Sequence, residues 1–139
     1  MHHEIECKWQ GKMEFEGKLN GHTIILDTTP SGGGENHGTS PKILLLLSAA
    51  GCTGMDVIPM LKKMQVPITG LNIRAIADGT DVDPKVYTSM KITFEFIGDN
   101  LESHRDKLER AVSLSQEKYC GVSAMLSKAM KITTQVVIV

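Results

Sequence analysis

The sequence has little net charge and no long hydrophobic segment. Its 139 residues carry a formal net charge of -1, whereas proteins dedicated to nucleic acids usually show a basic excess. The longest apolar run, residues 43–55, is shorter than the roughly 20 residues that a membrane-spanning helix needs. The first residues also lack the apolar core of a secretory signal. We therefore expect a cytoplasmic protein with no nucleic-acid partner and no membrane partner.

Cysteine is scarce, and the few cysteines do not follow familiar spacings. Cys7, Cys52 and Cys120 are an odd number of thiols, which is not typical of a disulfide scaffold. The sequence has no Cys-x-x-Cys or His-x-x-His spacing, so a metal site built from Cys52, Cys120 and His37 has little support, and we expect no metal. No G-x-S-x-G motif indicates a serine hydrolase. Thiol redox chemistry is the better-supported possibility.

The pattern of apolar residues predicts a single domain over residues 1–139 with an α+β fold. Strands and helices occur in segregated runs, which favour this class over a doubly wound sheet. Asn100 is expected to cap the second long helix. The predicted strands cover residues 5–10, 13–16, 23–27, 71–79, 86–96 and 131–139, and the predicted helices cover residues 41–65, 101–119 and 122–130.

The segment before the first long helix and the helix itself differ sharply in composition. Residues 28–41 include three consecutive glycines and two prolines, which predicts a flexible loop. Ser40 and Pro41 then have the residue types of an N-cap and a first helical position. The helix is apolar on every side through residue 50, which predicts that protein surrounds it. Glycines on both sides of Cys52 predict a bend or break there.

The three cysteines have different local contexts. Cys7 alternates with other apolar residues of a strand, so we interpret it as packing material. Cys52 lies where an interrupted helix would leave backbone N–H groups that favour a thiolate. Cys120 directly precedes a short helix, where it can act as N-cap and where the helix dipole favours an anion. A lowered pKa is therefore reasonable for Cys52 and Cys120, and two unrelated core cysteines are the alternative.

Two segments together resemble the OsmC/Ohr family of thiol-dependent peroxide-handling proteins. "GGGENHGTSPKILLLLSAAGCTGMDVIPMLKKM" is similar to the family's glycine loop and first-cysteine helix, and "SQEKYCGVSAMLSKA" to its second-cysteine segment. The similarity extends over nearly the whole chain and is greatest to the small OsmC-like branch. It implies antiparallel sheets packed around central buried helices, in an intertwined homodimer with two sites at the subunit interface.

The resemblance also implies a chemistry for two of the cysteines. Cys52 would be the peroxidatic thiolate that attacks an organic hydroperoxide, and Cys120 would be the resolving thiol. A dithiol reductant would reopen the resulting disulfide, as part of a stress response without a cofactor.

The sequence departs from the family pattern near the expected thiolate. Characterised peroxidases of the family use an N-terminal arginine and a glutamate at the start of the first-cysteine helix. Here no arginine precedes Arg74, and Lys42 occupies the position of the glutamate. Lys42, His37 and Glu35 are therefore possible thiolate-supporting residues, while Gly121 replaces the proline that commonly follows the resolving cysteine. The alternative function is noncatalytic binding of a small apolar ligand at the dimer interface.

Overall fold

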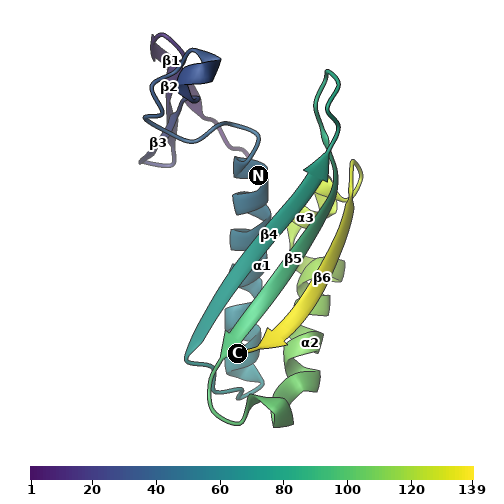
Figure 1. The fold of residues 1–139 in the computed structure, drawn as a ribbon. Coiled ribbons are helices and arrows are strands. Elements are labelled where there is room, and N and C mark those ends of the chain that lie inside the picture. The colour runs from purple at the N-terminus through teal and green to yellow at the C-terminus, as the bar shows by residue number, and fades with distance from the viewer. The chain divides into compact units, whose positions relative to one another are not determined.

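The computed structural model describes residues 1–139, which divide into two compact units, residues 1–45 and 46–139. Each unit contains one three-stranded sheet (Figure 1). The helices lie almost entirely in the C-terminal unit, so strands and helices are segregated as an α+β fold requires. That a single domain spans residues 1–139 stays a prediction.

The N-terminal unit is an antiparallel meander, as the alternating sequence predicts. Strands β1 (Glu6–Gly11), β2 (Glu14–Leu19) and β3 (His22–Leu26) pair in chain order. Cys7 pairs with Gly17 across the sheet and is exposed. The prediction that Cys7 is packing material is therefore wrong for this chain, because no element of its own unit covers that face.

The loop after β3 is organised around one buried carboxylate. Asp27 accepts hydrogen bonds from the backbone N–H groups of Thr28 at 2.7 Å, Glu35 at 3.2 Å and His37 at 3.0 Å. At Gly34, a Cβ would collide with the Thr28 carbonyl oxygen. The glycine there permits close backbone packing. The segment is a loop, as predicted, and its hydrogen bonds to Asp27 define its course, while its flexibility stays a prediction. The loop includes a short 3-10 helix, η1 (Pro30–Gly32).

The C-terminal unit has a mixed sheet of β4 (Gly70–Gly79), β5 (Tyr87–Ile97) and β6 (Lys131–Ile138). β4 and β5 are antiparallel, but β5 and β6 are parallel. The prediction of purely antiparallel sheets is wrong here, because the helices between β5 and β6 form the crossover that a parallel pair requires. These elements are η2 (Leu101–His104), α2 (Arg105–Leu114), the π-helix η3 (Ser115–Tyr119) and α3 (Gly121–Leu126).

Asn100 does not cap the helix that follows it. Its backbone is left-handed, with φ of 56°, and its side chain makes no capping hydrogen bond. The chain therefore makes a turn at Asn100 and enters α2 through the 3-10 turn of η2.

One face of β5 forms the centre of the core. Met90, Ile92, Phe94 and Phe96 alternate along the strand and are buried, as the two-residue period of a strand predicts. The rings of Phe94 and Phe96 stack with centroids 6.4 Å apart. Two of the helices contribute six further buried core residues, which are Ala49, Val57, Leu61, Leu108, Ala111 and Val112, and Val66, Leu101 and Met130 complete the core.

Helix α1 (Leu44–Lys63) runs without interruption through Cys52 and includes Pro59. The predicted break at Cys52 is wrong, since the flanking glycines remain helical. Its length and composition would suffice to cross a membrane, but α1 is a core helix. Its buried residues recur every four positions, at Ala49, Thr53, Val57 and Leu61, whereas Leu47 is 66% exposed. The single chain therefore covers only one side of α1, and burial of the other side by further protein stays a prediction.

Candidate functional site

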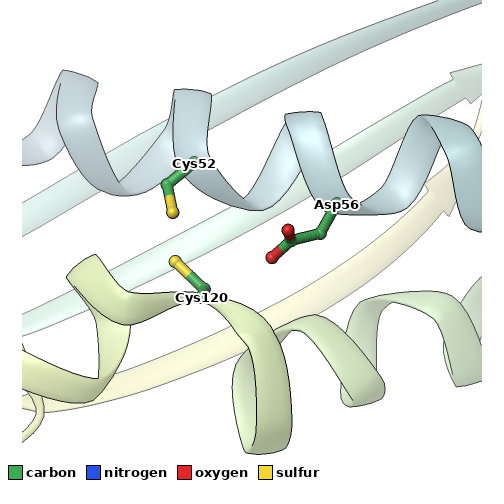
Figure 2. A group of neighbouring side chains, drawn as sticks. All are labelled: Cys52, Asp56 and Cys120. Carbon is green, nitrogen blue, oxygen red and sulfur yellow. The ribbon is translucent and has the colours of Figure 1, made fainter. Parts of the chain in front are cut away.

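The C-terminal unit brings Cys52 and Cys120 together, although they are far apart in sequence. The sulfur atoms of both residues and a carboxylate oxygen of Asp56 all lie within 4.8 Å of one another, and Figure 2 shows the three side chains converging between two segments. Cys52 and Asp56 are one turn apart on α1, which places them on the same helix face. Cys120 lies between η3 and α3. The predicted proximity of the two thiols is thus present in the structure.

The π-helix before Cys120 positions that residue against α1. The Cys120 N–H donates to the Ser115 carbonyl at 2.7 Å, a bond across five residues that widens the turn. The Ser115 hydroxyl donates to Asp56 Oδ2 at 2.8 Å, and Gln116 Nε2 donates to Thr53 Oγ1 at 3.0 Å. Two side-chain hydrogen bonds therefore tie this turn to the helix that carries Cys52.

Cys120 is buried and has hydrogen-bond donors around its sulfur. It caps α3, as predicted, because its Sγ accepts the Ser123 N–H at 3.3 Å. Thr53 Oγ1 lies 3.7 Å from the same sulfur. Burial raises the pKa of Cys120, but the Ser123 hydroxyl, Cys52 and the Ser123 N–H together outweigh burial and hold the pKa below its ordinary value. The Ser123 hydroxyl is buried without a hydrogen bond of regular geometry, so the adjacent sulfur is its available acceptor.

Cys52 is half-buried and its electrostatic surroundings differ from those of Cys120. Burial raises the pKa of Cys52, and so do its hydrogen bond to Cys120 and the negative charge of Asp56, against the weaker opposing effect of the Val122 N–H. The expected lowering of the Cys52 pKa is therefore wrong. Because α1 is continuous, its backbone N–H groups at Cys52 are used within the helix. The donors around Cys120 therefore favour its thiolate, with the Cys52 thiol as one of the hydrogen-bond donors.

The three possible thiolate-supporting residues lie in the N-terminal unit. His37 Nδ1 is 2.7 Å from Glu14 Oε1, and Lys12 Nζ is 2.8 Å from Glu35 Oε1. The hydrogen bond with Glu14 raises the pKa of His37, and the hydrogen bond from Lys12 lowers the pKa of Glu35. The Lys42 carbonyl accepts a hydrogen bond at the start of α1. A role for Glu35, His37 or Lys42 toward Cys52 stays a prediction.

Two side-chain clusters have the composition of a metal site. In the N-terminal unit, ligand atoms of Glu14, Asp27 and His37 lie within 4.8 Å of one another. However, Asp27 already accepts three backbone hydrogen bonds and His37 is bonded to Glu14. In the C-terminal unit the corresponding cluster is the two thiols with Asp56.

The sequence interpretation missed the polar residues that surround the thiol pair, namely Thr53, Asp56, Ser115, Gln116 and Ser123. The sequence spacing of two of these residues could have indicated their place in the site. Asp56 is four residues after Cys52, which places it on the same side of any helix. Ser123 is three residues after a predicted N-cap, the position whose N–H a cap accepts. The others depend on the π-helical turn, which no sequence pattern indicated.

A cavity of about 410 Å³ adjoins the thiol site and provides an apolar surface beside it. Asp56 belongs both to the cavity wall and to the thiol cluster. The cavity is lined by Met55, Asp56, Pro59, Met60, Lys63, Leu114 and Tyr119.

Known proteins share both the sequence pattern and the fold. The family model described as OsmC-like protein matches residues 32–135. Protein YhfA of Escherichia coli K12 is 31% identical over 131 residues, which cover 94% of this chain and 93% of YhfA. A hypothetical protein from Aquifex aeolicus VF5 is 29% identical with a TM-score of 0.86, covering 100% of this chain and 97% of that one. The organic hydroperoxide resistance protein OhrB of Bacillus subtilis has the same fold at 13% identity, with a TM-score of 0.68 and 98% of each chain covered. The chain belongs to the OsmC-like family.

Proposed function

We propose that this protein reduces organic hydroperoxides through Cys52 as the peroxidatic residue and Cys120 as the resolving residue. The observation that carries the proposal is the proximity of the two sulfur atoms, within 4.8 Å. Cys52 is half-buried and can meet a hydroperoxide, whereas Cys120 is buried behind it. The organic hydroperoxide resistance protein of the same fold supports this class of substrate, as does the apolar cavity beside the site.

The two thiols share the steps of the reaction. The Cys52 sulfur attacks the outer oxygen of the hydroperoxide, the O–O bond breaks, and the products are Cys52 sulfenic acid and an alcohol. The Cys120 thiolate then attacks the sulfenic sulfur, forms a disulfide and releases hydroxide. A dithiol reductant returns both cysteines to thiols and is itself oxidised. The hydrogen-bond donors at Cys120 favour this second step, because they lower the pKa of the resolving residue and so stabilise its thiolate.

The proposal includes an intertwined homodimer in the cytoplasm. Large apolar side chains of α1 remain uncovered in the single chain, with Leu47 66% and Met55 80% exposed. Exposed apolar surface of this kind is typical of a protein interface. A second copy would cover α1 and complete an apolar site.

Treatment of the reduced protein with cumene hydroperoxide tests the thiol chemistry. We expect the wild type to form one disulfide between Cys52 and Cys120, detected by peptide mass spectrometry. Cys120→Ser should accumulate a sulfenic acid at Cys52 that dimedone traps, and Cys52→Ser should not react. Cys7→Ser is the matched control, since Cys7 is exposed and lies in the other unit, and it should behave as wild type. A wild type that stays reduced, or a Cys52→Ser variant that still consumes hydroperoxide, contradicts the proposal.

The raised pKa of Cys52 favours a second candidate, noncatalytic binding of a small apolar ligand at the dimer interface. A protonated thiol is a poor nucleophile, and the neighbouring Asp56 charge opposes its ionisation. Native mass spectrometry of the purified protein separates the two functions. A co-purified ligand with slow thiol reactivity supports binding, whereas a ligand-free protein with rapid hydroperoxide consumption supports the peroxidase.

A further inference from the structure

We propose that Cys52, Asp56 and Cys120 form a binding site for a thiophilic divalent cation, with Zn²⁺ as the best-matched ion. The three side chains present two sulfur atoms and one carboxylate oxygen, all within 4.8 Å of one another, and they converge on a common point (Figure 2). Zinc binds both thiolate sulfur and carboxylate oxygen in proteins. The inference does not depend on the proposed peroxidase activity.

The distances fit one shared ion after a small side-chain adjustment. Zinc binds sulfur at about 2.3 Å and carboxylate oxygen at about 2.0–2.2 Å, so ligand atoms around a tetrahedral ion are about 3.5–3.8 Å apart. All three residues lie on helical backbone or directly at its end, which limits the rearrangement to side-chain rotation. Three protein ligands leave the fourth position open to water.

Neighbouring hydrogen bonds prepare the ligands for a cation. The Ser115 hydroxyl donates to Asp56 Oδ2 at 2.8 Å, which fixes the orientation of this carboxylate. The Ser123 N–H donates to Cys120 Sγ at 3.3 Å, and the buried, unpartnered Ser123 hydroxyl gains a full acceptor once Cys120 is a metal-bound thiolate. Such outer hydrogen bonds orient ligands and strengthen metal sites.

The charges in the cluster also favour a cation. Asp56 forms no salt bridge, so its carboxylate, hydrogen-bonded by Ser115, keeps its negative charge beside the two sulfur atoms. When both thiols ionise, three negative groups converge, and a divalent ion neutralises two of these charges. Binding to the reduced protein should therefore release protons, up to one from each thiol, without any change of oxidation state. Bound zinc would block both sulfur atoms from oxidants.

Metal titration of the reduced full-length chain tests the site. Cobalt(II) bound to the wild type should give thiolate-to-cobalt charge-transfer absorption and the intense visible bands of tetrahedral coordination, at one ion per chain. Calorimetry with Zn²⁺ in buffers of different ionisation enthalpy should show proton release. Zinc should also protect Cys52 from alkylation, measured by peptide mass spectrometry, while exposed Cys7 stays reactive.

Matched variants assign the ligands. Asp56→Asn keeps the side-chain shape and should weaken Zn²⁺ binding by more than about tenfold, while Ser115→Ala should weaken it by about tenfold through the lost orienting hydrogen bond. Asp99→Asn, a charge-matched change in an exposed turn, should bind as wild type. Cys52→Ser and Cys120→Ser should each lose the charge-transfer band or halve it. Equal affinities for Asp56→Asn and Asp99→Asn, or a wild type without tetrahedral cobalt bands, would overturn the proposal, and circular dichroism verifies that each variant is folded.

Discussion

The substitution Ser123→Ala should leave the protein as stable or stabilise it at low pH and destabilise it at high pH. The Ser123 hydroxyl is buried with no hydrogen-bond partner of regular geometry. A neutral Cys120 thiol is only a weak acceptor for it, and a buried unsatisfied polar group costs about 1–3 kcal/mol. Well below pH 9.0, the ordinary value for a cysteine, Ser123→Ala should therefore be as stable as wild type or more stable by about 1 kcal/mol. The hydroxyl becomes favourable only when Cys120 is a thiolate, since a hydrogen bond to a charged group contributes about 1.5–3 kcal/mol.

The sign follows from the depressed pKa of Cys120 in the folded state. Stability from this depression is fully present above the unfolded value of 9.0 and is lost as the pH falls through the lower folded pKa. Removing the hydroxyl removes part of this gain, so the wild type should overtake Ser123→Ala as the pH rises toward 9.0. Urea unfolding under reducing conditions, followed by circular dichroism at several pH values, measures both free energies. Ser113→Ala, an exposed serine of α2, is the control. A difference between wild type and Ser123→Ala that stays constant with pH refutes the reasoning.

Two further variants test the two units separately. Phe94 is fully buried at the centre of the sheet, so Phe94→Ala should reduce the free energy of unfolding by about 3–5 kcal/mol. Urea titrations followed by circular dichroism measure this change. A loss below about 1 kcal/mol would contradict the placement of Phe94 in the core. Backbone hydrogen bonds hold the pKa of Asp27 below 3.8, the ordinary value for aspartate. The ionised carboxylate therefore stabilises the fold fully above pH 3.8, and this stabilisation is lost as the pH falls through the lower pKa of the folded state. Asp27→Asn should weaken this acid transition in the fluorescence of Trp9, the only tryptophan, and an unchanged transition would contradict the role of the carboxylate.

The sequence predicted the elements that depend on local periodicity and missed those that depend on distant partners. Alternating apolar residues located β5 to within one residue at each end, and the residue type before α3 indicated the cap at Cys120. The glycine loop was interpreted from composition alone, because the hydrogen bonds of Asp27 join residues that lie up to ten positions apart. The parallel pairing of β6 likewise depends on a crossover, which a strand pattern does not reveal.

In the site too, the sequence predicted the local features and missed those that depend on distant partners. Among the missed features, the charge beside the two thiols has the largest consequence for function. Characterised peroxidases of the OsmC/Ohr family use an arginine to support the thiolate, whereas within the C-terminal unit of this chain a charged neighbour of Cys52 is Asp56, held by Ser115. Burial and the hydrogen bond to Cys120 raise the pKa of Cys52, and the charge of Asp56 adds to this effect, while the hydrogen-bond donors around Cys120 lower the pKa of that thiol. Any cation that enters the site therefore changes its chemistry. A cationic group would favour release of the Cys52 proton and attack on a hydroperoxide, whereas a metal ion would release the same proton and occupy the sulfur. Peroxide reduction and metal binding thus both require the deprotonated Cys52 sulfur and exclude one another, so peroxidase activity must be measured under metal-free conditions.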